Sequence, residues 1–347
     1  AWMLRWTGSD ATRFHEEEGA LETEEDLNAA RGGSVFNEPD SRRPWELVLE
    51  DYQKRKPRWK VPETSGDVEN HKEKMIPLVR KVLVLSENPG IPGVNKYDTF
   101  IRDGVLMKPF SLEPEKGILL PGILMTSTSA REEKEEVIVY LNEAGKAQLS
   151  DEWNTVKKLL DDGYTLCAMD LRGIGETSPD MIGNYFWDFM AGKPIFGQRV
   201  RDVLSIVKWL KETEVNFSKI RLWGKGVCAL YSAMAGVLSE DISTLILEEP
   251  LVSFESLMMT EVPGYRNEIL LPGVLEKFDM PQVYQALCPK KVLLLNPLGG
   301  DKQPAAEEVI QKMKNHVFPA FQTMGTPGNW SIETALGGNR EEIIWRF

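Results

Sequence analysis

The sequence is poor in the residues that most often carry chemistry. It has three histidines, three cysteines and no uninterrupted apolar run of about 18 residues in a chain of 347. Three scattered cysteines exclude a disulfide scaffold or a cysteine-rich zinc site, and the lack of a long apolar run excludes a transmembrane helix. No set of His, Cys, Asp and Glu has metal-ligand spacing. We therefore predict neither a metal nor a cofactor.

Positive charge is scarce as well. The chain carries 41 Lys and Arg against 53 Asp and Glu, a net charge of −12. This balance argues against nucleic acid or an anionic membrane as the main partner. Residues 1–50 alone hold a net charge of −7, which is typical of a solvated acidic arm. The hydrophobic fraction of 42% is that of an ordinary globular protein with one large or two medium domains.

The chain begins Ala-Trp-Met, with neither an initiator Met nor a signal peptide. We expect a processed or trimmed chain, or a piece of a longer one. The composition predicts a soluble protein and does not fix its location, and export with removal of a signal segment is compatible with this start.

From about residue 135 onward, apolar strands alternate with amphipathic helices. This pattern predicts a mostly parallel, doubly wound α/β sheet covered on both faces, over residues 96–347, with residues 1–95 as a helical extension. The expected early elements are helices at 44–54 and 72–85 and a hairpin of strands at 105–110 and 117–126. The later strands are expected at 136–141, 165–170, 220–223, 244–247, 292–296 and 330–335, and the later helices at 151–161, 200–212, 227–238 and 305–314.

The segment RLWGKGVCA at residues 221–229 carries the sharpest motif. In doubly wound sheets, sites form beyond the carboxyl ends of the strands, and here a strand leads through a glycine-rich turn into a helix. Two motifs use that geometry: the nucleophile elbow Gly-x-Ser-x-Gly and the dinucleotide fingerprint Gly-x-Gly-x-x-Gly/Ala. Gly224, Gly226 and Ala229 fit the second, with Glu248 about 20 residues further on as a ribose-binding acid. That fingerprint normally follows the first strand of its sheet, whereas at least two strands precede it here, so the elbow is favoured.

Neighbouring segments support the elbow. The stretch GYTLCAMDLRGIGET at 163–177, followed by GQRVRDV at 197–203 before a helix ending in Trp209-Leu210, resembles the approach to the elbow in α/β-hydrolases. Over residues 100–347 the chain is similar to acetyl xylan esterase-like members of that family. Further segments carry this resemblance, namely LLPGIL at 119–124, VIVYLNEAGK at 137–146, LPGVL at 271–275, FDMP at 278–281 and ALCPKKVL at 286–293.

The resemblance implies a catalytic triad, and the sequence departs from it. Gly226 stands at the nucleophile position, and Cys228 replaces the second elbow glycine. Asp301 falls on the loop that carries the family's acid, but no histidine follows the last strand. The histidines are His15, His71 and His316. Because a nucleophile and its base must lie within hydrogen-bond reach, the chain is predicted to be a non-catalytic or accessory hydrolase-like domain, a pseudoenzyme.

Other residues near the elbow were candidates for a pocket or an atypical site. Asn142, Glu143 and Val227 are expected where the family builds its oxyanion hole. A carboxylate at Glu143 would oppose a developing oxyanion if it faced the pocket rather than solvent. Cys228 lies in a first helical turn, which lowers a thiol pKa, but a buried core cysteine is the more frequent case.

Three functions therefore remain open: an accessory esterase-like domain, an active carboxylic-ester hydrolase with an atypical nucleophile, and a dinucleotide-binding protein. The ligand expected for the first is a carbohydrate ester. Its expected partner is a catalytic hydrolase domain upstream or a second copy of the chain. The start AWMLRW resembles the tryptophan-rich helix that ends a hydrolase domain in longer esterase-like proteins.

Overall fold

The computed structural model describes residues 6–8, 19–30, 32–85, 90–130, 132–178, 185–212, 217–335 and 339–347. The chain divides into two compact units, Ala1–Arg55 and Lys56–Phe347. The first unit contains α2 (Glu24–Leu27), the 3₁₀ turn η2 (Val35–Asn37) and α3 (Pro44–Arg55). Residues 1–5 and 9–18, which include most of the predicted tryptophan-rich helix and His15, lie outside the described residues.

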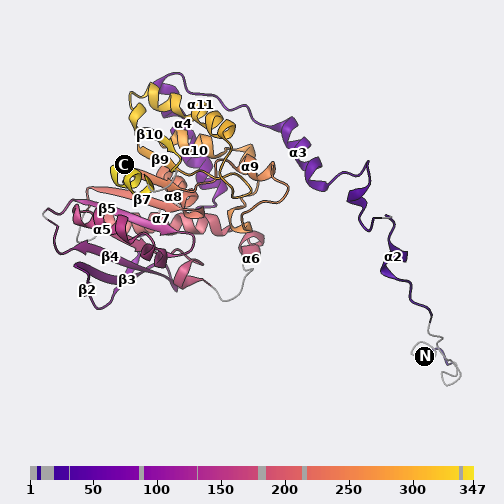
Figure 1. The fold of residues 1–347 in the computed structure, drawn as a ribbon, viewed down its shortest axis with the longest axis horizontal. Helices are drawn as coiled ribbons and strands as arrows, with labels where there is room; N and C mark the ends of the chain where they lie inside the picture. The colour runs from indigo at the N-terminus through magenta and orange to yellow at the C-terminus, as the bar shows by residue number, and fades with distance from the viewer. Residues whose placement is uncertain are drawn as a thin grey trace. The chain divides into compact units, whose positions relative to one another are not determined.

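The second unit is built on a ten-stranded sheet with the order β1-β3-β4-β6-β5-β7-β8-β9-β10, and β2 pairs with β3 (Figure 1). Strands β5 to β10 run parallel, whereas β1 to β4 form an antiparallel part joined to β6 through β4. The strands are β1 (Gly93–Lys96), β2 (Phe100–Arg102), β3 (Val105–Glu115), β4 (Ile118–Ser127), β5 (Glu136–Asn142), β6 (Thr165–Met169), β7 (Lys219–Lys225), β8 (Ile242–Glu248), β9 (Lys291–Leu295) and β10 (Trp330–Glu333).

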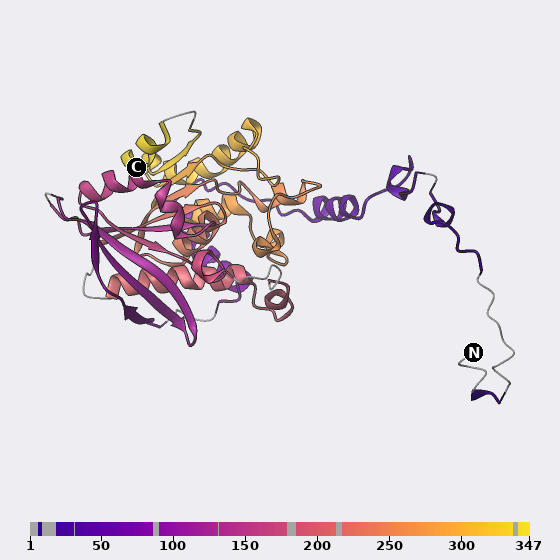
Figure 2. The same cartoon turned by 60° about the horizontal axis from the view of Figure 1, so that its bottom comes forward.

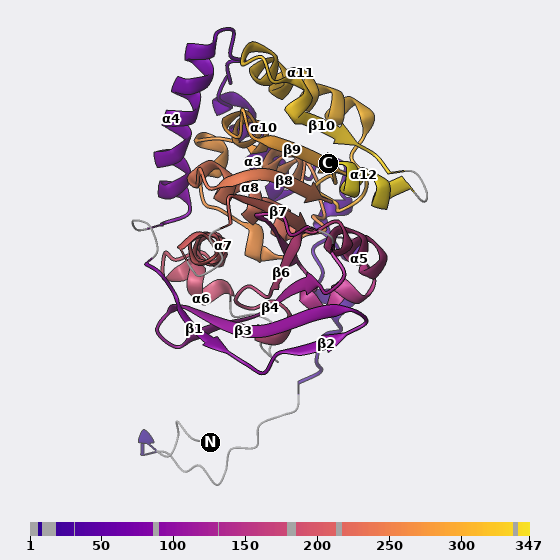
Figure 3. The same cartoon turned by 90° about the vertical axis from the view of Figure 1, so that its left-hand side faces the viewer.

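Helices cover both faces of this sheet (Figures 2 and 3). One face carries α4, α7, α8, α10 and α11, and the other carries α5 and α12. The helices of this unit are α4 (Ser65–Val82), α5 (Trp153–Asp161), α6 (Tyr185–Met190), α7 (Ile195–Glu212), α8 (Val227–Leu238), α9 (Phe254–Met258), α10 (Met280–Ala286), α11 (Glu307–Thr323) and α12 (Arg340–Arg346). The 3₁₀ turns are η3 (Lys146–Ser150), η4 (Gly175–Thr177), η5 (Asn267–Ile269), η6 (Val274–Glu276) and η7 (Pro327–Asn329).

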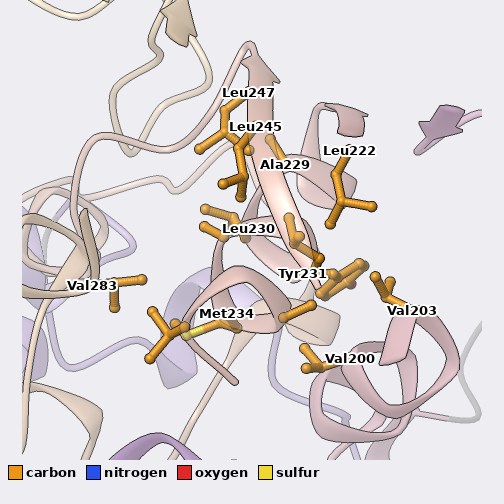
Figure 4. Packing of buried hydrophobic residues seen from close by; sticks show 14 of the residues in the cluster. Val200, Val203, Leu222, Ala229, Leu230, Tyr231, Met234, Leu245, Leu247 and Val283 are labelled. Atoms are coloured by element: carbon orange, nitrogen blue, oxygen red, sulfur yellow. The ribbon is translucent and has the colours of Figure 1, made fainter. Parts of the chain in front are cut away.

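Strand β5 shows why both faces are apolar. Its side chains alternate between faces, so Val137, Val139 and Leu141 join the larger core, while Ile138 and Tyr140 join the smaller one. All five are buried. The sequence of a strand that is buried on both sides is an unbroken run of apolar residues, and VIVYL at 137–141 is such a run. In the larger core, side chains of β7 and β8 meet side chains of α7, α8 and α10 (Figure 4).

The predicted fold class is confirmed: a mostly parallel sheet flanked by helices on both faces. Helix α8 has the predicted bounds. Two helices begin earlier than predicted, α4 at Ser65 and α7 at Ile195. The start of α4 is set by a capping box in which Thr64 and Asp67 satisfy each other's backbone N–H groups. Strand β3 continues to Glu115, so the hairpin turn is shorter than predicted.

Helix α4 belongs to the second unit, although the sequence assigned it to the N-terminal extension. Its side chains Val68, Met75 and Val79 are buried in the larger core. The boundary at 95/96 stays a prediction. Among the described residues, no helix combines the length and the apolar character that a membrane span requires.

Candidate functional site at the β7–α8 turn

Gly226 forms the turn between β7 and α8 at the carboxyl edge of the parallel strands. Its φ is 63° and its ψ is −132°, a conformation that residues with a side chain rarely adopt. Its N–H donates to the backbone oxygen of Glu248 on the neighbouring strand (2.9 Å). The sequence-predicted strand-turn-helix geometry is therefore present, with a glycine at its tip.

The Glu143 carboxylate lies on this turn. It follows β5 and accepts a hydrogen bond from the Val227 N–H through Oε2 (3.0 Å). Lys302, from the loop after β9, donates to Glu143 Oε1 (2.7 Å). The Lys302 ammonium also lies 5.5 Å from the centre of the Tyr265 ring, within the range of a cation–π contact. Glu143 thus faces the turn rather than solvent.

Glu143 also fills the space beside Gly226. A Cβ built on Gly226 would lie 2.3 Å from both Cδ and Oε2 of Glu143. A side chain at position 226 and the present conformation of Glu143 therefore exclude each other. The carboxylate occupies the volume that a nucleophile on this turn would need, and it takes the N–H that would bind an oxyanion.

Asn142 holds the loop that carries Glu143. Its Oδ1 accepts the Ala144 N–H (2.9 Å), and its Nδ2 donates to the Tyr140 hydroxyl (2.8 Å). Burial raises the pKa of Tyr140, so its hydroxyl stays protonated at neutral pH. Asn142 is buried, and both ends of its side-chain amide form hydrogen bonds within the protein. It therefore positions the loop that carries Glu143.

Beside the turn, a group of charged side chains joins the strand ends to α12. Arg340 pairs with Glu152 (2.6 Å) and, through Nη2, with Glu248 (2.7 Å). Lys225 lies 3.4 Å from Glu248, and the Trp223 Nε1–H donates to Glu248 (3.2 Å). Burial acts to raise the pKa of Glu248, but the pairing with Arg340 and Lys225 outweighs it and the pKa is lowered. Sequence reasoning missed Arg340 and Lys302, because neither occupies a position that the hydrolase motifs mark.

The remaining cleft next to Glu143 is small and acidic. Its volume is about 220 Å³. Lys225 is its basic lining residue, and the carboxylates that line it are Glu143, Asp151, Glu152 and Glu249. Such a lining repels anions and leaves little room for a ligand.

The predicted acid, Asp301, lies on the loop after β9. Its Oδ1 accepts the Gln303 N–H (3.0 Å), and its side chain lines a different cleft from the one beside Glu143. Its neighbour Lys302, with φ of 63°, is the residue that reaches the turn. The loop therefore brings a cation rather than a carboxylate to Gly226.

Cys228 is fully buried in the larger core. Burial raises the pKa of its thiol, the opposite of what a thiolate nucleophile needs. Cys167 and Cys288 are buried as well, and burial raises the pKa of Cys288 to about 11. These thiols are core side chains.

The two described histidines lie between helices. His71 Nε2 is 2.8 Å from the backbone oxygen of Gln282, and His316 Nε2 is 2.6 Å from the Gln282 side-chain nitrogen. The segment after β10 has no histidine in its sequence, and residues 336–338 lie outside the described residues.

The turn does not favour a dinucleotide. The Val227 N–H, which would face a pyrophosphate, is taken by a carboxylate. Glu248, the expected ribose ligand, is committed to Arg340. In the described part of the chain, no group of three His, Cys, Asp or Glu side chains is arranged to hold a metal ion.

No family model matches the chain, and no curated protein matches it in sequence. Solved structures do match it. One, from Bacteroides fragilis and assigned as an acetyl xylan esterase, has a TM-score of 0.67 at 14% identity and covers 90% of this chain and 87% of its own.

Two further structures are similar over most of the chain. The methylesterase BT1017 has a TM-score of 0.62 at 14% identity, covering 87% of this chain and 67% of its own. A CE15 glucuronoyl esterase from Teredinibacter turnerae has a TM-score of 0.57 at 11% identity, covering 82% of this chain and 83% of its own. At such identities the likeness concerns the fold alone, which is of the α/β-hydrolase type.

Proposed function

We propose that this chain is a degenerate, non-catalytic member of the esterase-like α/β-hydrolases and acts as an accessory domain. The observation that carries the proposal is the Glu143 carboxylate on the Val227 N–H, in the space beside Gly226. An esterase needs that N–H for the developing oxyanion. A fixed carboxylate there removes the donor and adds a repelling charge.

Three further observations support the proposal. Position 226 has no side chain, so it offers no nucleophile. The Cys228 thiol is buried in the core. Lys302 pairs with Glu143 at 2.7 Å, which holds the carboxylate in place. The active-hydrolase alternative would require a nucleophile and a base within reach of each other, and the described residues of this site supply neither.

The accessory role we propose is to hold a carbohydrate ester or a partner domain. The partner would be a catalytic hydrolase domain upstream or a second copy of the chain. A carbohydrate ester fits the esterase-like fold, since the similar structures include proteins assigned as acetyl xylan and glucuronoyl esterases.

Hydrolysis of p-nitrophenyl acetate and labelling by a fluorophosphonate test the proposal. We expect turnover at the rate of buffer alone and no labelling. Matched controls are Cys228→Ala and His316→Ala. Enzymatic turnover that persists in both variants would contradict the proposal, and turnover lost only in Cys228→Ala would establish the thiol as nucleophile.

A stronger test rebuilds the missing groups. Gly226→Ser alone, or with Glu143→Ala, should give no hydrolysis because both described histidines lie at Gln282 and neither is placed to take the proton. Adding Gly337→His or Gly338→His to that pair supplies a base in the segment after β10, and hydrolysis by the triple variant but not by the pair would support the loss of a former catalytic site. Efficient hydrolysis by Gly226→Ser alone would reveal an intact base and end the pseudoenzyme interpretation.

A further inference from the structure

A second cleft lies on the other side of the loop after β9. It is formed by α9, the start of α10, this loop and α11, together with the segment before α4, and we call it the α9–α11 cleft. Its volume is about 590 Å³, within the range of roughly 300–1,000 Å³ typical of small-molecule sites. Neither Gly226 nor Glu143 lines it, so it is distinct from the site at the turn.

One part of the cleft lining is apolar. Trp59 is half-buried and precedes α4, while Met259, Val309 and Met313 come from α9 and α11. An indole ring offers a flat apolar surface with little conformational entropy to lose. A ligand with a flat apolar face can stack on such a ring.

Hydroxyl groups from the α9 segment line the cleft as well. The Ser256 hydroxyl donates to the Ser253 backbone oxygen (2.6 Å), and the Thr260 hydroxyl donates to the Ser256 backbone oxygen (2.8 Å). With their protons committed to the backbone, these oxygens keep lone pairs that accept hydrogen bonds from a ligand.

The tautomer of His316 follows from its contact with Gln282. Gln282 Oε1 accepts the Asp279 N–H (3.0 Å), so its amide nitrogen faces His316 Nε2 (2.6 Å). That ring nitrogen must accept, which assigns a neutral imidazole with its proton on Nδ1. His316 is one of the residues that line the cleft, and this tautomer adds no net charge to the lining.

The cleft lining carries two lysines and three carboxylates. Lys56 forms an ion pair with Glu255, and Lys312 and Asp301 add one cation and one carboxylate to the lining. Asp279 is buried, and its carboxylate accepts hydrogen bonds from the backbone N–H groups that begin α9 and α10. A lining with one carboxylate in excess selects against an anionic ligand, whereas hydroxyl acceptors and an aromatic face suit an uncharged, hydroxyl-rich one.

We propose that the α9–α11 cleft binds a neutral saccharide of one or two sugar rings, with one ring stacked on Trp59. The proposal deepens the accessory role and rests on it, because it places the ligand away from the turn blocked by Glu143. Its readout is binding, whereas that of the non-catalytic proposal is ester hydrolysis, so each can fail without the other.

Calorimetric titration of the full chain with xylotetraose tests the site. Trp59→Ala should weaken binding about tenfold or more, which corresponds to about 1.4 kcal/mol, while Trp59→Phe should retain most of the affinity. The matched control is Trp187→Ala, which removes a tryptophan that is 62% exposed on α6 and does not line the cleft. It should bind as the unmodified chain does. Thr260→Val, which removes an acceptor without removing the ring, should also weaken binding.

Several outcomes would overturn the proposal. They are no heat of binding up to about 10 mM saccharide, equal affinity in Trp59→Ala and the unmodified chain, or equal losses in Trp59→Ala and Trp187→Ala. Loss of binding in Glu143→Ala but not in Trp59→Ala would place the ligand at the turn instead. Tighter binding of inorganic phosphate than of xylotetraose would contradict the neutral-ligand argument.

Discussion

Glu143 is held from two directions, by the Val227 N–H and by the Lys302 ammonium. Both partners come from segments far along the chain, since Lys302 lies 159 residues away. At the scale of single residues, the turn is therefore organised around an anion that the protein itself supplies. A helix N-terminus favours a negative charge, and here that charge is a side chain.

Gly226→Ser tests how closely Glu143 and position 226 are coupled. We expect the serine variant to fold but to lose about 1–3 kcal/mol of stability from positive-φ strain, with a further loss because its Cβ meets Glu143 at 2.3 Å. Combining Gly226→Ser with Glu143→Ala should recover the stability that is lost to the clash with Glu143. The measurement is urea denaturation of both single variants and the double variant.

The two single variants and the double variant form a double-mutant cycle. Their changes in unfolding free energy should be non-additive, with the double variant more stable than the sum of the single changes predicts. Strict additivity would mean that Glu143 leaves the turn at no cost. The control is Gly273→Ser, at a glycine that also has positive φ (67°) but has no atom within 4 Å of a built Cβ. Gly273 has αL backbone (φ 67°, ψ 15°), which is less strained for serine than the backbone of Gly226. Gly273→Ser should therefore lose less stability and show no coupling to Glu143.

At the scale of elements, α4, α10 and α11 meet around Gln282, with one histidine on each outer helix. Burial lowers the pKa of both His71 and His316 below the ordinary value. The unfolded chain therefore binds more protons than the folded one just below pH 6.5, and stability should fall as pH drops through that range. Asp279 acts in the opposite sense, because burial raises its pKa to about 6 and its proton stabilises the folded state at lower pH.

His316→Gln separates the contribution of His316 to the pH dependence of stability from that of Asp279. A glutamine can still accept from Gln282 but does not titrate, so the variant should lose less stability than the unmodified chain between pH 7.5 and pH 5. Chemical denaturation at each pH measures the difference, in which the contribution of Asp279 cancels. An identical pH dependence for both chains would show that His316 protonates freely in the folded state.

The sequence predicts some elements better than others for physical reasons. Helix α8 has the predicted bounds because a glycine with positive φ marks its start and most of its residues are apolar. The start of α4 was missed because its first turn is polar and its signal is the pair Thr64 and Asp67. Strands β1 and β2 are mostly exposed and carry no apolar pattern.

The site was predictable only where it is local. The turn at Gly226 follows from nine consecutive residues, and Glu143 follows from its place after β5. The sequence does not predict the orientation of Glu143, because this orientation depends on Lys302 and the sequence has no signal for a contact between loops so far apart. Arg340 could have been noticed as a basic residue opening the last helix, but its partners lie far away in the sequence, Glu152 at the N-cap of α5 and Glu248 at the end of β8.

At the scale of the whole molecule, the division of the chain can be tested by truncation. Residues Ala1–Arg55 form one unit and Lys56–Phe347 the other, whereas the sequence predicts a boundary at 95/96. The two divisions differ in where they place α4. Val68, Met75, Val79 and Leu83 are each at most 2% exposed and belong to the larger core.

Removal of residues 1–55 should therefore leave a cooperatively folding chain with an unchanged melting profile. Removal of residues 1–95 should abolish cooperative unfolding. Four buried apolar side chains at about 1.5–3 kcal/mol each exceed the lower end of the 5–15 kcal/mol that holds a typical domain together. Scanning calorimetry distinguishes the two truncated chains. A sharp transition in the shorter one would support the boundary at 95/96, and the burial of α4 would then contribute far less than its packing implies.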